Sequence, residues 1–155
     1  FDDHEIVIMA SIVEKETGAA RERPLIASVF LNRLSLKRFP SRKLETDPTI
    51  IYGCTVPLVK SPACLQFKGR IRRIHLRDKE NRYNTYEHAK LPPGPISNPG
   101  RDSLRAVIRP AHSKYLYFVS KNDGTHHFSS TFAEHNRMVD RYQRRRRTTP
   151  PASMR

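Results

Sequence analysis

Long apolar runs and a recognisable leader are both missing from this sequence. No run of about 18 apolar residues occurs, so no segment is expected to span a membrane. The chain starts at Phe1 without a methionine, a basic leader or an apolar signal region. We therefore expect a fragment or a processed form, with any anchor or export signal lying upstream of this chain.

Cysteine is scarce, and its scarcity limits the metal chemistry. The two cysteines, Cys54 and Cys64, exclude a zinc site built from cysteines alone. In an oxidising compartment the pair could close a small disulfide loop, and elsewhere both would remain thiols. The sequence does not decide between these two states.

Acidic residues are few compared with basic ones. Asp and Glu number 15 against 29 Lys and Arg, which gives a formal net charge of +14. Such a charge indicates an anionic partner, and nucleic acid, an anionic membrane or an acidic wall polymer would all qualify. The 155 residues correspond to about one domain, which excludes a two-domain enzyme with a separate cofactor fold.

The positive charge is concentrated in two places. Arg144–Arg147 precedes two adjacent prolines and lacks a periodic apolar face. We therefore expect a folded domain over residues 1–143 and a disordered basic tail over 144–155. A second basic block, Lys60–Arg82, carries eight Lys and Arg against two acidic residues.

Apolar periodicity and terminal signals predict a largely helical chain. Apolar residues at spacings of three and four mark a first helix, and Gly18 provides its C-terminal stop. Pro24 suits the first turn of a second helix. Asp47, as an N-cap, and Pro48 open a short third helix. The helices expected from such signals cover residues 4–17, 24–36, 47–53, 102–109 and 131–142.

Two further patterns complete the expected fold. Six prolines forbid long regular elements over residues 54–100. Strand formers at 115–120, a turn and a return strand beginning at His126 predict an antiparallel hairpin. Thr131 and Glu134 have the spacing of a capping box for the last helix. The expected fold class is α+β, mostly helical with one small antiparallel sheet.

The first predicted helix carries a carboxyl group on its apolar stripe. At about 100° per residue, Glu16 falls within the arc that contains Met9 and Val13, whereas Glu14 falls outside it. A desolvated glutamate tends to have a raised pKa, and a carboxyl that holds its proton can act as a general acid. The alternative is that the last turn frays and Glu16 reaches water, and periodicity alone favours this alternative. Glu14 is expected to be structural.

Several short blocks occur in one order along the chain and carry a resemblance. They are Ala10–Thr17, Val29–Leu34, Leu44–Gly53, Tyr83–Tyr86, Leu91–Ile96, Asn98–Gly100 with Ser103 and Leu104, Tyr115–Val119, His126 with Phe128, and His135 with Asn136. Together, from about residue 5 to residue 142, they closely resemble the YceG/MltG family of endolytic murein transglycosylases. Each block is modest alone, but the ordered set is specific.

The resemblance implies a function and a fold. Family members cleave the β-1,4 bond between N-acetylmuramic acid and N-acetylglucosamine without water and leave 1,6-anhydro ends, which terminates or releases nascent glycan strands. The second glutamate of the E-K-E sequence, Glu16, is implied as the catalytic residue. Implied partners are glycan strands and cell-wall synthases, at the periplasmic face of the bacterial inner membrane. The membrane anchor and a LysM-like subdomain would lie upstream, and no cofactor is implied.

Polar and aromatic residues of the matched blocks are the candidate substrate ligands. They are Asn32, Thr46, Asp47, Tyr52, Tyr83, Asn84, Thr85, Tyr86, Asn98, His126 and His135. Five of these polar residues, Asn32, Thr46, Asp47, Asn84 and Thr85, could alternatively orient Glu16. Asp47 as a helix cap, the tyrosines as packing and the histidines as support of the cleft are the simpler alternatives. Neighbouring His126 and His127 would point to opposite faces of a strand, and no cysteine or carboxylate stands at ligand spacing, so no metal is expected.

The chain also departs from the family pattern. Position 45 is Glu where many relatives have Gln, the connection that contains both cysteines is longer than usual, and the stretch from Lys68 to Arg82 is more basic. Two other functions therefore stay open. One is a basic module that binds nucleic acid, although no helix-turn-helix, zinc-finger or RNP pattern is present. The other is an inactive member that binds glycan as a scaffold.

Overall fold

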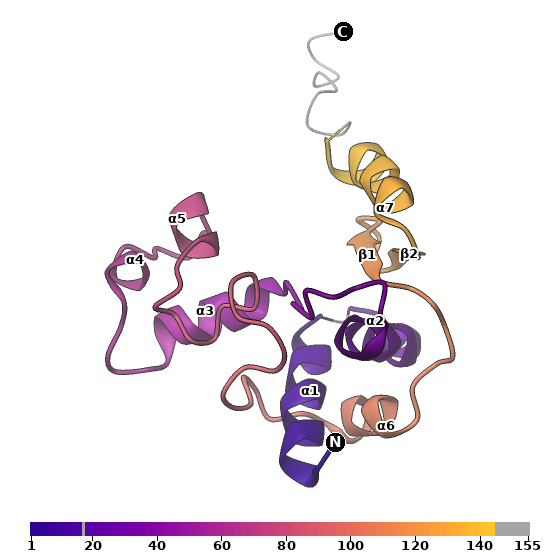
Figure 1. The fold of residues 1–155 in the computed structure, drawn as a ribbon, viewed down its shortest axis with the longest axis horizontal. Coiled ribbons are helices and arrows are strands. Elements are labelled where there is room, and N and C mark those ends of the chain that lie inside the picture. The colour runs from indigo at the N-terminus through magenta and orange to yellow at the C-terminus, as the bar shows by residue number, and fades with distance from the viewer. Residues whose placement is uncertain (17, 145–155) are drawn as a thin grey trace, which may run out of the picture.

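Three helices form the body of the protein. The structure, a computed structural model, describes residues 1–16 and 18–144. The proposed tail lies outside them except for its first residue. Helices α1 (Asp3–Glu16), α2 (Arg23–Ser35) and α6 (Arg101–Ile108) pack against one another around a core that contains Met9, Phe30 and Ala106 (Figure 1). The apolar stripe predicted for the first helix is therefore the face that α1 buries.

The ends of the body helices follow local signals. The Asp2 side chain accepts a hydrogen bond from the Glu5 backbone N–H at 2.8 Å, and the Glu5 side chain accepts one from the Asp2 N–H at 3.1 Å. These reciprocal bonds satisfy backbone donors that a helix start leaves free. The 3-10 turn η1 (Ala20–Glu22) leads into α2, whose first turn contains Pro24 as predicted.

A hairpin packs on α2, and a further helix packs on the hairpin. Strands β1 (Tyr117–Ser120) and β2 (His126–Ser129) pair antiparallel, with Tyr117 opposite Ser129. Helix α7 (Phe132–Val139) packs on both strands, and the π-helix η2 (Asp140–Arg144) follows it. The predicted α+β class, mostly helical with one small antiparallel sheet, is confirmed. The helix predicted to run to Tyr142 is α-helical as far as Val139 and continues as the π-helix.

The predicted capping box of α7 is half formed. The Thr131 side chain accepts a hydrogen bond from the Glu134 N–H at 3.2 Å. The Glu134 carboxylate does not return to the cap but contacts His127 Nε2 at 3.2 Å. The imidazole of His127 on β2 competes with the Thr131 backbone N–H for this carboxylate, and a ring that can carry charge is the stronger donor. The predicted hydrogen bond from the Thr131 N–H to Glu134 was therefore wrong.

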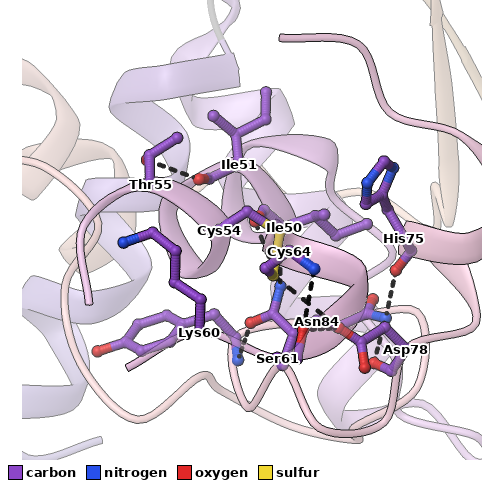
Figure 2. Close-up of a disulfide and its surroundings, with 12 residues drawn as sticks. Ile50, Ile51, Cys54, Thr55, Lys60, Ser61, Cys64, His75, Asp78 and Asn84 are labelled. Atoms are coloured by element: carbon purple, nitrogen blue, oxygen red, sulfur yellow. Dashed lines mark hydrogen bonds between the residues drawn. A yellow bond between two sulfur atoms is a disulfide. The ribbon is translucent and has the colours of Figure 1, made fainter. Parts of the chain in front are cut away.

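Residues 47–90, hereafter the disulfide lobe, extend away from the body (Figure 1). They contain α3 (Asp47–Thr55) and two single-turn helices, α4 (Pro62–Leu65) and α5 (Arg73–Leu76), which the sequence did not predict. A disulfide joins Cys54 of α3 to Cys64 of α4, which settles the state that the sequence left open (Figure 2). The rest of the lobe is irregular, as the prolines predicted.

Asn84 organises the irregular part of the disulfide lobe. It is fully buried, and its amide nitrogen donates hydrogen bonds to the carbonyls of His75, Leu76 and Asp78 at 2.9–3.1 Å. Its side-chain oxygen accepts from the Tyr86 N–H at 3.0 Å. One side chain thus replaces the backbone ladder that this segment lacks.

Among the described helices, none combines the length and apolar content needed to cross a membrane.

Candidate active site

A cavity of about 420 Å³ lies where the body, the hairpin and the disulfide lobe meet. The C-terminal end of α1, the middle of α2, the segment before α3, strand β1 and helix α7 all contribute to it. Its polar and aromatic lining consists of Glu16, Phe30, Arg33, Glu45, Asp47, Tyr86, Tyr117, Phe118, Phe132 and His135. The predicted catalytic residue thus shares a cavity with three of the predicted ligands, namely Asp47, Tyr86 and His135.

Glu16 is partly buried and held by one hydroxyl group. The Thr46 Oγ1 donates a hydrogen bond to Glu16 Oε1. Burial raises the pKa of Glu16, and the nearby charge of Asp47 raises it further, whereas the Thr46 hydrogen bond and the charge of His126 lower it. The balance leaves the pKa above that of a free glutamate. This carboxyl therefore retains its proton to a higher pH than an exposed glutamate does.

Thr46 is itself fixed by two other buried threonines. Its backbone N–H donates to Thr85 Oγ1 at 2.9 Å. The Thr49 and Thr85 hydroxyls are 2.9 Å apart, and Thr49 Oγ1 donates to the Thr46 carbonyl at 2.8 Å. Thr85, a predicted ligand, supports Thr46 and does not line the cavity. The three residues hold the donor that faces Glu16.

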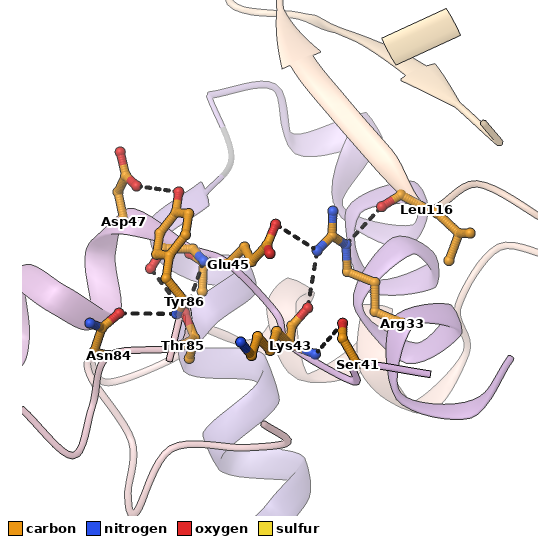
Figure 3. Close-up of polar contacts among 10 residues, drawn as sticks. Arg33, Ser41, Lys43, Glu45, Asp47, Asn84, Thr85, Tyr86 and Leu116 are labelled. Atoms are coloured by element: carbon orange, nitrogen blue, oxygen red, sulfur yellow. Dashed lines mark hydrogen bonds and ion pairs between the residues drawn. The ribbon is translucent and has the colours of Figure 1, made fainter. Parts of the chain in front are cut away.

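Asp47 contacts a tyrosine and does not cap its helix. It is the first residue of α3, and Thr46 occupies the N-cap position, so the prediction that Asp47 caps the helix was wrong. The Tyr86 hydroxyl donates to Asp47 Oδ1 at 2.6 Å (Figure 3). Burial and the hydrogen bond to Asp47 raise the pKa of Tyr86. Tyr86 therefore remains a neutral donor that holds the Asp47 carboxylate at the cavity.

Arg33 is a cavity residue that sequence reasoning missed. Its guanidinium Nε donates to the Leu116 carbonyl at 2.7 Å, and Nη1 donates to the Lys43 carbonyl at 3.0 Å and contacts Glu45 Oε2 at 3.5 Å (Figure 3). Burial lowers the pKa of Arg33, and Glu45 opposes that change. Arg33 lies in the matched block Val29–Leu34, which was the available signal.

The Arg33 guanidinium also contacts the faces of two aromatic rings. It lies 4.6 Å from the ring centroid of Phe39 and 5.1 Å from that of Tyr117. Glu45, its ion-pair partner, has a φ of 53°, in a left-handed region that side chains other than glycine rarely adopt. This strained backbone turns the chain toward Thr46 and the cavity.

An aromatic wall closes the other side of the cavity. The rings of Tyr117 and His135 stack with centroids 4.9 Å apart, and Phe132 contacts Tyr117 edge-on at 5.8 Å. Phe132 is 63% exposed although it belongs to a folded helix. Burial, then the charge of Arg33, lowers the pKa of His135, which favours a neutral ring at neutral pH. Tyr117 stands in a matched block, whereas no sequence signal marked Phe132.

Two predicted ligands contribute to the surroundings of the cavity without lining it. His126 Nδ1 lies 2.9 Å from Glu22 Oε1, and the His126 N–H donates to Glu22 Oε2 at 3.2 Å. This pair is close enough for His126 to influence Glu16 electrostatically. Asn32 donates to the carbonyls of Ser113 and Tyr115, both at 2.9 Å, and so ties α2 to the segment before β1.

Four other predicted ligands lie elsewhere. Tyr52 and Tyr83 pack together at a centroid distance of 4.7 Å, and Tyr83 borders a separate cavity in the disulfide lobe. Asn84 is the buried organiser described above. Asn98 is exposed outside the cavity. The structure does not bring these four to Glu16.

Glu14 has a structural environment, as its position outside the apolar stripe predicted. Its Oε1 accepts from the Gly100 N–H at 2.8 Å and the Ser103 hydroxyl at 3.0 Å. Its Oε2 lies 3.7 Å from Arg23. The backbone hydrogen bond is the main reason that the pKa of Glu14 is lowered. Within residues 1–16 and 18–144, no group of three or more metal-ligating side chains is found.

Comparison with known proteins identifies relatives. A family model described as the YceG-like family matches residues 1–141. A Bacillus subtilis (strain 168) protein named endolytic murein transglycosylase is 38% identical over 139 residues, which cover 90% of this chain and 34% of that protein. A protein of the same name from Streptococcus pneumoniae serotype 2 (strain D39 / NCTC 7466) is 29% identical over 145 residues, covering 88% of this chain and 23% of that protein.

A solved structure agrees with these sequence relatives. The crystal structure of a yceG-like protein from Listeria monocytogenes has a TM-score of 0.70 and 39% sequence identity, covering 87% of this chain and 39% of that chain. The chain covers 34% and 23% of the lengths of the two named transglycosylases. Because the family model covers nearly all of the described residues, the chain belongs to the YceG-like family.

Proposed function

We propose that this domain is a lytic transglycosylase that cleaves peptidoglycan glycan strands internally, with Glu16 as its acid and base. The observation that carries the proposal is a partly buried glutamate of raised pKa, oriented by Thr46 at the wall of a cavity. The names of the two curated relatives support the same reaction class.

The reaction needs only one carboxyl group. Most glycosidases use two, one as the acid and the other as base or nucleophile. In a lytic cleavage the 6-hydroxyl of the N-acetylmuramic acid is the nucleophile. Glu16 gives its proton to the glycosidic oxygen, and the bond from that oxygen to C1 breaks. The 6-hydroxyl oxygen then bonds to C1 and loses its proton to the Glu16 carboxylate, which leaves a 1,6-anhydro ring and restores the acid.

Neighbouring groups tune these two steps. Asp47 places a second negative charge at the cavity, which raises the pKa of Glu16 and favours the positive charge that develops at C1. Thr46 orients the carboxyl for both proton transfers. On the opposite side, the exposed face of Phe132 with Tyr117 and His135 offers apolar surface for sugar rings.

The finer biological role is also part of the proposal. Internal cleavage with 1,6-anhydro ends would terminate or release nascent strands at the periplasmic face of the inner membrane. Cell-wall synthases are the expected partners, since they supply the strands. The net charge of +14 suits a polymer that bears carboxylates.

The test is digestion of purified murein sacculi followed by mass spectrometry. The native chain should release fragments with 1,6-anhydro ends, Glu16→Gln should release none, and Glu14→Gln should still release them. Reducing ends in place of anhydro ends would show hydrolysis. Binding without products would favour the scaffold alternative. Salt-sensitive binding to DNA without glycan binding would favour the nucleic-acid module.

A further inference from the structure

The loop between α3 and α4 exposes aliphatic side chains that nothing in the described part of the chain covers. Leu58 is 98% exposed and Val59 is 91% exposed, and Val56 at the end of α3 and Leu65 in α4 are exposed as well. Single apolar residues on a surface are common, but adjacent fully exposed ones gathered in one loop mark an interaction site. We call these four residues the apolar tip.

A disulfide and side-chain hydrogen bonds fix the loop that carries the apolar tip. The disulfide between Cys54 and Cys64 closes its two ends (Figure 2). Within it, Lys60 Nζ donates to the Pro57 carbonyl at 2.6 Å, and Ser61 Oγ donates to Asp78 Oδ2 at 2.5 Å. Because the loop is tied at these points, Leu58 and Val59 are held outward by the loop's own architecture.

Exposed cations are numerous in the lobe that carries the apolar tip. The exposed basic residues that follow the tip in the disulfide lobe are Lys68, Arg70, Arg72, Arg73, Arg77, Lys79, Arg82 and Lys90. Val59, Lys60 and Arg82 border one shared cavity, so the tip and the basic segment are neighbours in space. Helices α4 and α5 of this segment also pack together, at the end of the lobe remote from α6 (Figure 1).

We propose that the disulfide lobe docks on an anionic lipid bilayer, with Leu58 and Val59 inserted at the interface. The partner must accept aliphatic side chains and several cations at one surface. An anionic bilayer does both, because its acyl boundary takes up apolar groups and its headgroups attract Lys and Arg. Glycans and nucleic acids carry negative charge but offer no apolar phase for two aliphatic side chains. The proposal stands independently of the reaction assigned to Glu16.

The first experiment uses the absence of tryptophan from the sequence. Leu58→Trp gives the full chain a single tryptophan, in the apolar tip, and Ile108→Trp gives one at a 62%-exposed position on α6, where arginines are also exposed. Excitation at long wavelength selects the tryptophan over the tyrosines. Vesicles of phosphatidylglycerol and phosphatidylcholine, with and without brominated acyl chains, are added to each. The tryptophan of Leu58→Trp should shift to shorter wavelength and be quenched by bromine, and that of Ile108→Trp should do neither. The reverse pattern, or no shift at Leu58→Trp, would overturn the proposal.

The second experiment separates insertion from simple charge attraction. The double variant Leu58→Ser with Val59→Ser keeps every charge, including the C-terminal arginines, and alters only exposed positions. It should bind phosphatidylglycerol vesicles at least about tenfold more weakly than the native chain, whereas Ile108→Ser should bind as the native chain does. Equal binding by the double variant would mean that charge alone holds the protein to lipid. Absence of vesicle binding together with capture of an acidic protein would assign the tip to a protein partner. Either result would overturn the proposal.

Discussion

Glu14 and Glu16, both in the last turns of α1, lie in opposite electrostatic environments. On the side toward α6, Glu14 accepts hydrogen bonds from Gly100 and Ser103 and pairs with Arg23, and its pKa is lowered. On the side toward the cavity, Glu16 is desolvated and its pKa is raised. Residues of one type, two positions apart, thus have one lowered and one raised pKa. Environments that drive pKa values apart in this way distinguish acids from structural anions.

The largest expected effect separates the two glutamates by activity. Glu16→Gln should lower the rate of anhydro-end formation on murein by about 10²–10⁴-fold, because the amide neither gives nor takes the proton. Glu14→Gln should keep most of the activity, since Glu14 lies outside the cavity. Product formation is measured by mass spectrometry over time. Equal losses in the two variants would mean that the comparison reflects folding and not chemistry.

The disulfide should stabilise the lobe that contributes Asp47 and Tyr86 to the cavity, whereas the partners of Glu14 lie outside that lobe. Replacing Cys54 and Cys64 by serine removes the cross-link of the lobe that carries Asp47 and Tyr86. The free energy of unfolding should fall by about 2–3 kcal/mol, as expected for a short closed loop. Urea unfolding of the native chain, with and without reductant, measures the effect. An unchanged midpoint after reduction would show that the lobe does not depend on the cross-link.

The hydroxyl of Thr46 should tune Glu16 specifically. Thr46→Val removes the hydrogen bond that favours the ionised carboxyl, so the pKa of Glu16 should rise further. The upper limb of the pH–rate profile should then move to higher pH, while the rate falls about tenfold because the carboxyl is less well oriented. Thr46→Ser, which keeps the hydroxyl, should restore both. An identical pH profile in Thr46→Val would remove Thr46 from this role.

The smallest expected effects concern stability and have opposite signs. The lowered pKa of Glu14 stabilises the fold above its unfolded pKa, and this contribution disappears as pH falls through the folded pKa. Glu14→Gln should therefore cost about 1 kcal/mol at pH 7 and less in acid. The raised pKa of Glu16 contributes stability in acid that is lost as pH rises through its folded pKa, so Glu16→Gln should be as stable as the native chain at pH 7, or more stable.

Chemical unfolding of Glu14→Gln and Glu16→Gln across pH 3–8 tests whether their free energies of unfolding change in opposite directions relative to the native chain. A loss of stability at pH 7 in Glu16→Gln as large as that in Glu14→Gln would contradict the assigned environments. The native chain serves as the reference at each pH, because protonation of other carboxyls affects all three proteins alike.

Local signals in the sequence predicted the longer helices but not the single-turn helices α4 and α5. The apolar spacing placed Glu16 on the stripe of the first helix but by itself favoured a side chain that reaches water. Local signals also did not identify the partner of Glu16; the family resemblance offered Thr46 as only one of five polar residues that could orient it. Thr46 is brought there by packing between α1 and the disulfide lobe, which no local pattern encodes. Arg33 and Phe132 were missed because both are tertiary features: a buried cation in contact with two rings, and an exposed ring in a cavity.

The incorrect cap at Asp47 shows how tertiary contacts override a local preference. An aspartate before a proline suits a helix start, but Tyr86, which follows much later in the chain, supplies a hydroxyl at 2.6 Å. Asp47 was expected to cap a helix but lines the cavity, whereas Asn84 was expected to be a ligand but is structural. The Asn84 amide donates to three carbonyls in its own lobe. The catalytic and ligand roles of the matched residues stay predictions until variants are measured.

Titration of the Glu16 carboxyl carbon by NMR measures the property on which its proposed role as a proton carrier depends. In protein labelled at the glutamate side-chain carboxyl carbons, the signals of Glu14 and Glu16 are assigned from their disappearance in the two Gln variants. The midpoint of Glu16 should lie above that of an ordinary glutamate and that of Glu14 below it. A Glu16 midpoint at or below the ordinary value would contradict the proposed acid.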